Sequence, residues 1–108
     1  SISNTTTTIV NTTGFFRIMT AVNCDTGGAG AQLAQFVLND GSTDKTIWKV
    51  PQFVNTAQSL HLDFTIFLPA GHSFKGQTTN SNVHINGAAY SVADVNGNLI
   101  SPSGFTFE

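Results

Sequence analysis

Short runs in which apolar and polar residues alternate follow one another along the chain, separated by residues typical of turns. The clearest run is 60–68, where every second residue is apolar: Leu60, Leu62, Phe64, Ile66 and Leu68. Because successive side chains of a β-strand point to opposite faces, this alternation predicts a strand with its apolar face in the core. The opposite face then carries His61, Asp63, Thr65 and Phe67.

The same period of two, or a β-branched composition, predicts further strands along the chain. They are residues 5–10, 15–23, 32–38, 45–50, 73–78, 83–95, 99–100 and 104–107. The segment 32–38 also fits one face of a helix, but its short length favours a strand. Residues 83–95 are expected to form one strand or two, with a break near Gly87. Pro51 places the strand before it at a sheet edge or at a strand end.

Turn residues separate these strands at intervals of about 8–12 residues, which is the spacing of all-β sandwiches. Asn39-Asp40-Gly41-Ser42 is a strong turn signal, and Asn96-Gly97 predicts a two-residue hairpin. We therefore predict an all-β fold: a single antiparallel β-sandwich, jelly-roll or immunoglobulin-like, with about seven to nine short strands. The sandwich is expected to span residues 11–108, and residues 1–10 are expected to form an N-terminal arm or edge strand.

The strand at 15–23 has apolar residues on both of its faces. One face carries an apolar row, and the other carries Phe15 and Met19. This pattern predicts a strand that is central in its sheet or covered on both sides. For Phe15, Met19 and Phe67, two interpretations stay open: apolar groups that face a partner, or part of a two-sided core.

Composition narrows the class of protein. Only 9% of the 108 residues are charged, against about 25% in an average soluble domain, and serine, threonine and asparagine take the place of charge. This favours a structural or binding module that lies against neighbours. A net charge of −2 offers no basic patch for nucleic acid, and no apolar run is long enough to span a membrane. The single Cys24 can form neither an internal disulfide nor a cysteine-based zinc site.

Candidate catalytic and ligand-binding residues are few, and their positions in the sequence do not match known catalytic or binding motifs. The loop Gly27–Gly30 follows a strand but opens no long helix, so it lacks the context of a dinucleotide site. Most aspartates lie in or beside turns, and only Asp63 lies in mid-strand. The spacing of His61, His72 and His84 matches no metal-binding signature. We therefore predict no enzyme activity, no catalytic residue, no metal and no cofactor.

Several short turn and strand motifs follow one another in a characteristic order. They are Asn11–Gly14, Gly27–Gly30, Leu68–His72, Asn80–Asn82 and Val83–Gly87. Their order and spacing resemble those of small phage and prophage virion proteins, which are capsid decoration or tail-associated proteins. The resemblance implies a β-sandwich that decorates a capsid or sits on a tail, with no catalytic residues to carry over.

These observations together lead to a functional expectation. We expect a phage virion structural protein, located in the virion, that acts as a capsid decoration or cement protein. In this role it would stabilise the head by binding the major capsid protein, and it would form a homo-oligomer. The alternative is a tail or fibre domain that binds a host cell-surface glycan through Trp48 or Tyr90, because carbohydrate sites favour exposed aromatic rings.

The N-terminal strand has no charged residue to guard an edge, so it is a candidate for addition to another chain's sheet. The glycine loop and the asparagine-rich turn are candidates for contacts with neighbouring subunits. The candidate partner-binding residues are Ile2, Thr6, Thr8, Val10, Gly28, Gly30, Asn80 and Asn82.

Overall fold

The structure is a computed structural model of the chain, and it describes residues 1–24, 33–50, 58–79, 81–100 and 104–107. Within these residues the backbone forms nine β-strands and no helix. The strands are β1 (Ile2–Ser3), β2 (Thr6–Val10), β3 (Gly14–Cys24), β4 (Ala34–Asn39), β5 (Asp44–Lys49), β6 (Gln58–Leu68), β7 (Ser73–Thr78), β8 (Val83–Ala93) and β9 (Gly104–Thr106). The predicted all-β fold is confirmed.

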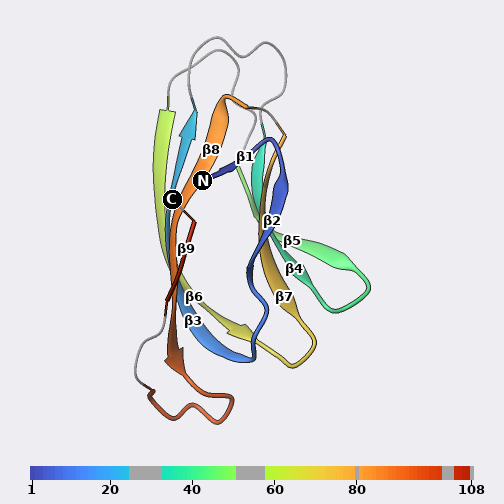
Figure 1. The fold of residues 1–108 in the computed structure, drawn as a ribbon, viewed down its shortest axis with the longest axis vertical. Coiled ribbons are helices and arrows are strands. Elements are labelled where there is room, and N and C mark those ends of the chain that lie inside the picture. Colours follow the sequence, from blue (N-terminus) through green and yellow to red (C-terminus); the bar gives the residue numbers. More distant parts are fainter. Residues whose placement is uncertain (25–32, 51–57, 80, 101–103, 108) are drawn as a thin grey trace.

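The strands form two antiparallel sheets that face each other as a sandwich (Figure 1). One sheet has the order β1-β8-β3-β6, and β9 pairs with β8 on the same edge as β1. The other sheet has the order β2-β7-β4-β5. β3 lies between β8 and β6, which confirms its predicted central position. The hairpin of β4 and β5 turns away from the first sheet (Figure 1).

The core lies between the sheets and is built from the inward-facing rows of the strands. On β3, the side chains of Phe16, Ile18 and Val22 are at most 2% exposed. From the opposite sheet, the rings of Phe36 and Phe74 stack with centroids 5.3 Å apart and planes 12° apart. Because full burial of each such side chain contributes about 1.5–3 kcal/mol, these rows are the main source of stability.

The first ten residues join the two sheets. β1 pairs with β8 of one sheet, and β2 pairs with β7 of the other. Asn4 lies between them with a φ of 51°, and its backbone N–H donates to Thr78 Oγ1. Ile2 is only 1% exposed, and its Cδ1 lies 2.8 Å from the position that a Cβ at Gly76 would take. This segment therefore supplies an edge strand to each sheet and the side chains of Ile2, Ile9 and Val10 to the core.

The last long strand follows one of its two predicted arrangements, a single strand, without the predicted break near Gly87. Residues Val83–Ala93 form one continuous strand, so Gly87 does not break it. A Cβ at Gly87 would lie 2.2 Å from the carbonyl oxygen of Met19 on the neighbouring β3. The glycine therefore permits a close approach of two strands, a role that sequence alone does not distinguish from a break.

The turn after β8 is wider than the two-residue hairpin predicted at Asn96-Gly97. The backbone N–H of Asp94 donates to the carbonyl oxygen of Asn98, which closes a loop around the turn. The Asp94 carboxylate accepts from the backbone N–H groups of Asn96 and Asn98, both at 2.9 Å. This side chain satisfies two backbone donors inside the turn, and it thereby stabilises the longer turn.

Candidate interaction surfaces

The five-stranded sheet has an outer face that points away from the core, and no described strand covers it (Figure 1). We use the name outer face for the residues that alternate with the core rows of its three long strands. They are Phe15, Arg17, Met19 and Ala21 of β3, His61, Asp63, Thr65 and Phe67 of β6, and Asn86, Ala88 and Tyr90 of β8.

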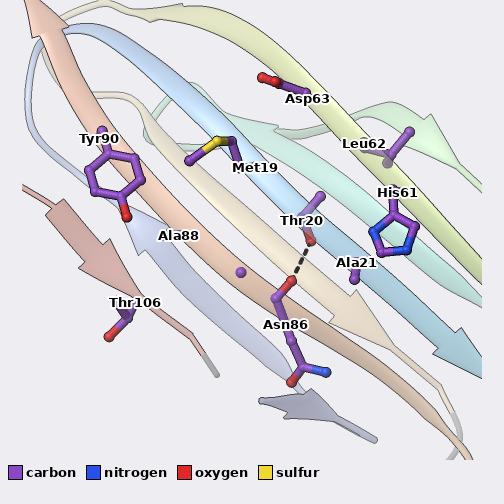
Figure 2. Close-up of a pocket in the computed structure, with 11 residues that line it drawn as sticks. Met19, Thr20, Ala21, His61, Leu62, Asp63, Asn86, Ala88, Tyr90 and Thr106 are labelled. Carbon is purple, nitrogen blue, oxygen red and sulfur yellow. Dashed lines mark hydrogen bonds between the residues drawn. The ribbon is translucent and has the colours of Figure 1, made fainter.

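Two charged groups of the outer face are paired with each other. Arg17 binds Asp63 through two hydrogen bonds, Nε to Oδ1 at 3.0 Å and Nη2 to Oδ2 at 2.6 Å. These bonds lower the pKa of Asp63, so its carboxyl group stays ionised. The positive charge of Arg17 balances the negative charge of this carboxylate. Thr20, from the inward row, donates its hydroxyl to the Asn86 carbonyl oxygen at 2.9 Å, as Figure 2 shows. Asp63 is therefore engaged in an ion pair, not in an acid–base pair.

A shallow depression lies at the centre of the outer face (Figure 2). Met19, Ala21, His61, Asn86 and Tyr90 line it, together with neighbouring residues of the same three strands and Thr106 of β9. Its walls combine one aromatic ring and one thioether with amide and imidazole groups. Such a mixed, open surface suits contact with another molecule but encloses no small ligand.

An aromatic pair marks one end of the outer face. The rings of Phe15 and Phe67 lie with centroids 4.7 Å apart, and Phe67 is 39% exposed. Phe67 also lines a cavity with Leu38, Lys45 and His72, so the chain itself borders this pair on one side, and a partner contact of these apolar groups stays a prediction.

A second apolar surface lies between β5 and β6, the edge strands of the two sheets. We call it the open side and define it by Ile47, Trp48, Leu60, Leu62 and Phe64. Four of these residues, with Asp63, line a groove between the strands. Leu60 and Ile47 are 38% and 42% exposed, although Leu60 belongs to the inward row of its strand. The core is thus incompletely covered along this side.

The candidate partner-binding residues are scattered over the fold. Ile2 and Val10 are each 1% exposed and belong to this chain's own core, so their side chains are not offered to a partner. Thr6 and Thr8 are exposed on the edge strand β2. Asn82 is half-buried in the turn before β8. Gly28, Gly30 and Asn80 lie outside the described residues, and partner binding by the remaining residues stays a prediction.

The two rings proposed for glycan binding have different surroundings. Trp48 packs against the core, with its ring centroid 5.5 Å from that of Phe36. Tyr90 is half-buried on the outer face, beside the depression. The two rings belong to different sheets, since β5 carries Trp48 and β8 carries Tyr90. The structure thus does not combine them into one aromatic platform.

Sequence reasoning did not identify the open side, because its β6 residues follow the pattern of a core strand. One signal pointed to it. Along the sequence, Ile47 lies two residues from Lys45 and two from Lys49, and a single apolar residue between two lysines indicates an exposed position. The register shift between β4 and β5 places Lys45 opposite Leu38 and Lys49 opposite Gln35, on different faces of the strand. The exposure of Leu60 depends on where the opposite sheet ends, which the local pattern does not record.

The described residues contain no group of three or more His, Cys, Asp or Glu side chains that could hold a metal ion. Cys24 is buried at the end of β3. No helix with the length and apolar character needed to cross a membrane occurs in the described part of the chain.

The fold is similar to that of known phage capsid proteins. Two crystal structures of a pentameric capsid protein isolated from metagenomic phage sequences match this chain with a TM-score of 0.76 and 30% identity. The match covers 94% of this chain but only 64% and 65% of theirs, so this chain spans less than two thirds of their length. No protein-family model and no curated protein matches the sequence. The comparison supports the resemblance to phage virion β-proteins.

Proposed function

We propose that this chain is a structural protein of a phage virion that forms a homo-oligomer and decorates the capsid by binding the major capsid protein. The observation that carries the proposal is the match of nearly the whole chain, 94% of it, to a pentameric phage capsid protein. By that analogy the oligomer is a ring of five copies. The finer role of a cement protein is supported by the exposed apolar groups on the described surface.

The surface chemistry supports a protein that acts through repeated contacts. Exposed apolar groups gather on the outer face and on the open side, and the best-formed ion pair of the outer face, Arg17 with Asp63, is internal to the chain. An ordinary specific interface buries about 1,600 Å² in total. Several smaller interfaces per copy can together give strong attachment. Once one contact of a copy has formed, the other contacts of the same copy form at a high effective concentration.

Two measurements test the proposal. Native mass spectrometry of the purified protein is expected to show a discrete homo-oligomer, with five copies as the predicted number. Co-sedimentation with phage heads that lack the protein is expected to give saturable binding and to raise the temperature at which the heads release their genome. A protein that stays monomeric and leaves the heads unbound contradicts the proposal.

A tail or fibre role in glycan binding is the alternative, and the position of Tyr90 favours it. Its ring lines the same depression as the Asn86 and His61 side chains, at the end near Met19 and Ala88, and aromatic, amide and imidazole groups are ones that sugar hydroxyls can use (Figure 2). Titration with host polysaccharide, followed by NMR, should then shift Tyr90 and Asn86 signals. The Tyr90→Ala variant should lose these shifts, while Trp48→Phe should retain them. Unchanged spectra of the wild type exclude this alternative.

A further inference from the structure

Burial of the core declines across the five-stranded sheet toward the open side. On the inward face of β3, Ile18 and Val22 are fully buried. On the neighbouring β6, Leu60 is 38% exposed and Phe64 is half-buried. The β4–β5 hairpin turns away from β6, which also leaves Ile47 42% exposed (Figure 1). Apolar side chains of both sheets therefore meet solvent at the same place.

The open side is also bordered by two free sheet edges. Among the described residues, β6 pairs with β3 alone and β5 pairs with β4 alone. Native proteins usually guard such edges with lysine or proline. β5 has Lys45 and Lys49, but β6 contains no Lys or Arg, and its single acid, Asp63, is bound by Arg17. A long edge strand with little protection is a surface for association with another chain.

A second copy of this chain is the occupant that the observations favour, because the similar capsid structures are pentameric. A ring of five copies needs contacts between two different surfaces, since contacts between identical surfaces close as dimers. The sandwich offers the second surface at the opposite edge of the four-stranded sheet, on β2. There Thr6, Thr7 and Thr8 are exposed and uncharged, so they can cover an apolar groove without burying a charge.

We infer that the open side binds the β2 edge of a second copy, and that this head-to-tail contact is the subunit interface of the oligomer. The inference rests on the proposed homo-oligomeric function and assigns its interface. It gives the partly exposed row of β6 a cover that the described part of the single chain does not provide. It also uses the exposed threonines of the N-terminal segment, while Ile2 and Val10 of that segment remain in the core.

A charge-insertion experiment tests the assignment. The Ile47→Glu and Leu60→Glu variants place a carboxylate on the open side, where assembly would bury it without a partner. Leu99→Glu is the matched control, because Leu99 is apolar and 88% exposed but lies in the segment after the β8 turn. Native mass spectrometry over a dilution series measures the protein concentration at which each variant assembles. For each open-side variant, this concentration should be more than about tenfold higher than for the wild type. Circular dichroism checks that all variants are folded.

The outcomes separate the inference from the proposed function. If the wild type is monomeric, both fail. If the wild type and the two open-side variants assemble equally well, the proposed function stands and the inferred interface is wrong. If Leu99→Glu weakens assembly as much as Ile47→Glu does, the assignment to the open side is also overturned. Loss of assembly in the open-side variants alone supports it.

Cross-linking tests the head-to-tail direction of the contact. Ile47→Cys is combined in turn with Thr6→Cys, Thr7→Cys or Thr8→Cys, and a short bismaleimide reagent is added; the native Cys24 is buried. At least one double variant should give covalent species larger than dimers. Ile47→Cys alone should give none, because each Ile47 faces a different surface of its neighbour. Covalent dimers from that single variant indicate a two-fold contact and overturn the inference.

Discussion

Among the described glycines, Gly87 leaves the least space for a Cβ atom, because the neighbouring strand β3 lies close to it. A Cβ there would lie 2.2 Å from the Met19 oxygen and 2.8 Å from the Thr20 Cα, both of which are backbone atoms that cannot rotate away. Gly87→Ala is therefore expected to lower the free energy of unfolding by about 1–3 kcal/mol, the usual range for overpacking. Urea denaturation measures the change.

Gly76→Ala is the matched control for this prediction. Its added methyl would meet the ends of flexible side chains, with Ile2 Cδ1 at 2.8 Å and Ile9 Cδ1 at 3.3 Å. These ends can move, so the loss of stability should be smaller than for Gly87→Ala. An equal or larger loss at position 76 would mean that backbone crowding does not explain the glycine at 87.

Asp94 makes the stability of the chain depend on pH. Its pKa is lowered, chiefly because the carboxylate accepts the backbone N–H of Asn98 and then that of Asn96. A carboxyl group whose pKa falls on folding stabilises the protein above its unfolded pKa of about 3.9, and this contribution disappears as pH falls through the folded value. Asp94→Ala should therefore be less stable than the wild type at pH 7, and the difference should shrink on acidification below about pH 4.

Unfolding midpoints measured from neutral pH to strongly acidic pH test this prediction. Asn98→Ala serves as the control, because it keeps the backbone N–H groups that the Asp94 carboxylate binds. It should retain most of the acid dependence of the wild type. A difference between wild type and Asp94→Ala that stays constant over the whole pH range would contradict the assigned cause.

At the scale of elements, β1 is a structural part of the sandwich despite its length of two residues. Ile2 pairs with Ile85 in register and is 1% exposed. Ile2→Ala is therefore expected to lower the free energy of unfolding by about 2–5 kcal/mol, whereas the exposed Thr7→Ala should change it by less than about 0.5 kcal/mol. Thermal or chemical denaturation of the two variants checks this contrast. An Ile2→Ala variant as stable as wild type would show that the segment detaches in solution.

This role of β1 affects how binding experiments on the N-terminus are interpreted. Deletion of residues 1–10 would remove core side chains together with the exposed threonines of β2. A loss of capsid binding after that deletion would then follow from unfolding alone. Substitutions confined to Thr6, Thr7 and Thr8 separate the surface from the core and are the sharper test of partner binding.

The strands with strong local alternation could be predicted from sequence, and those defined by distant partners could not. β6 and β7 follow the period of two closely, and the segment 32–38, which also fitted a helix, forms the strand Ala34–Asn39 between β7 and β5. β1 consists of two residues, and only its pairing with β8, far away along the chain, defines it as a strand. No local pattern contains that information.

At the scale of the whole molecule, the sequence predicted the class of fold but not the position of its uncovered surfaces. Apolar residues on both faces of β3 and β6 indicated a second apolar surface, and the outer face with Phe67 is such a surface. The open side remained hidden, because Leu60 and Phe64 have the spacing of core residues. Their exposure arises from the relative extent of two sheets, which is a property of the assembled fold.

The low charge of the chain predicts how its assembly responds to salt. Only 9% of the residues are charged, and the surfaces inferred to meet are an apolar groove and an edge of threonines. Salt screens charge–charge attraction but does not weaken apolar burial, so the concentration needed for assembly should change by less than about threefold between 0.05 and 0.5 M sodium chloride. Light scattering over a dilution series at each salt concentration measures it. A tenfold weakening of assembly at high salt would instead assign the contact to the charges of Lys45 and Lys49. In that case the Lys45→Ala/Lys49→Ala double variant would fail to assemble even at low salt.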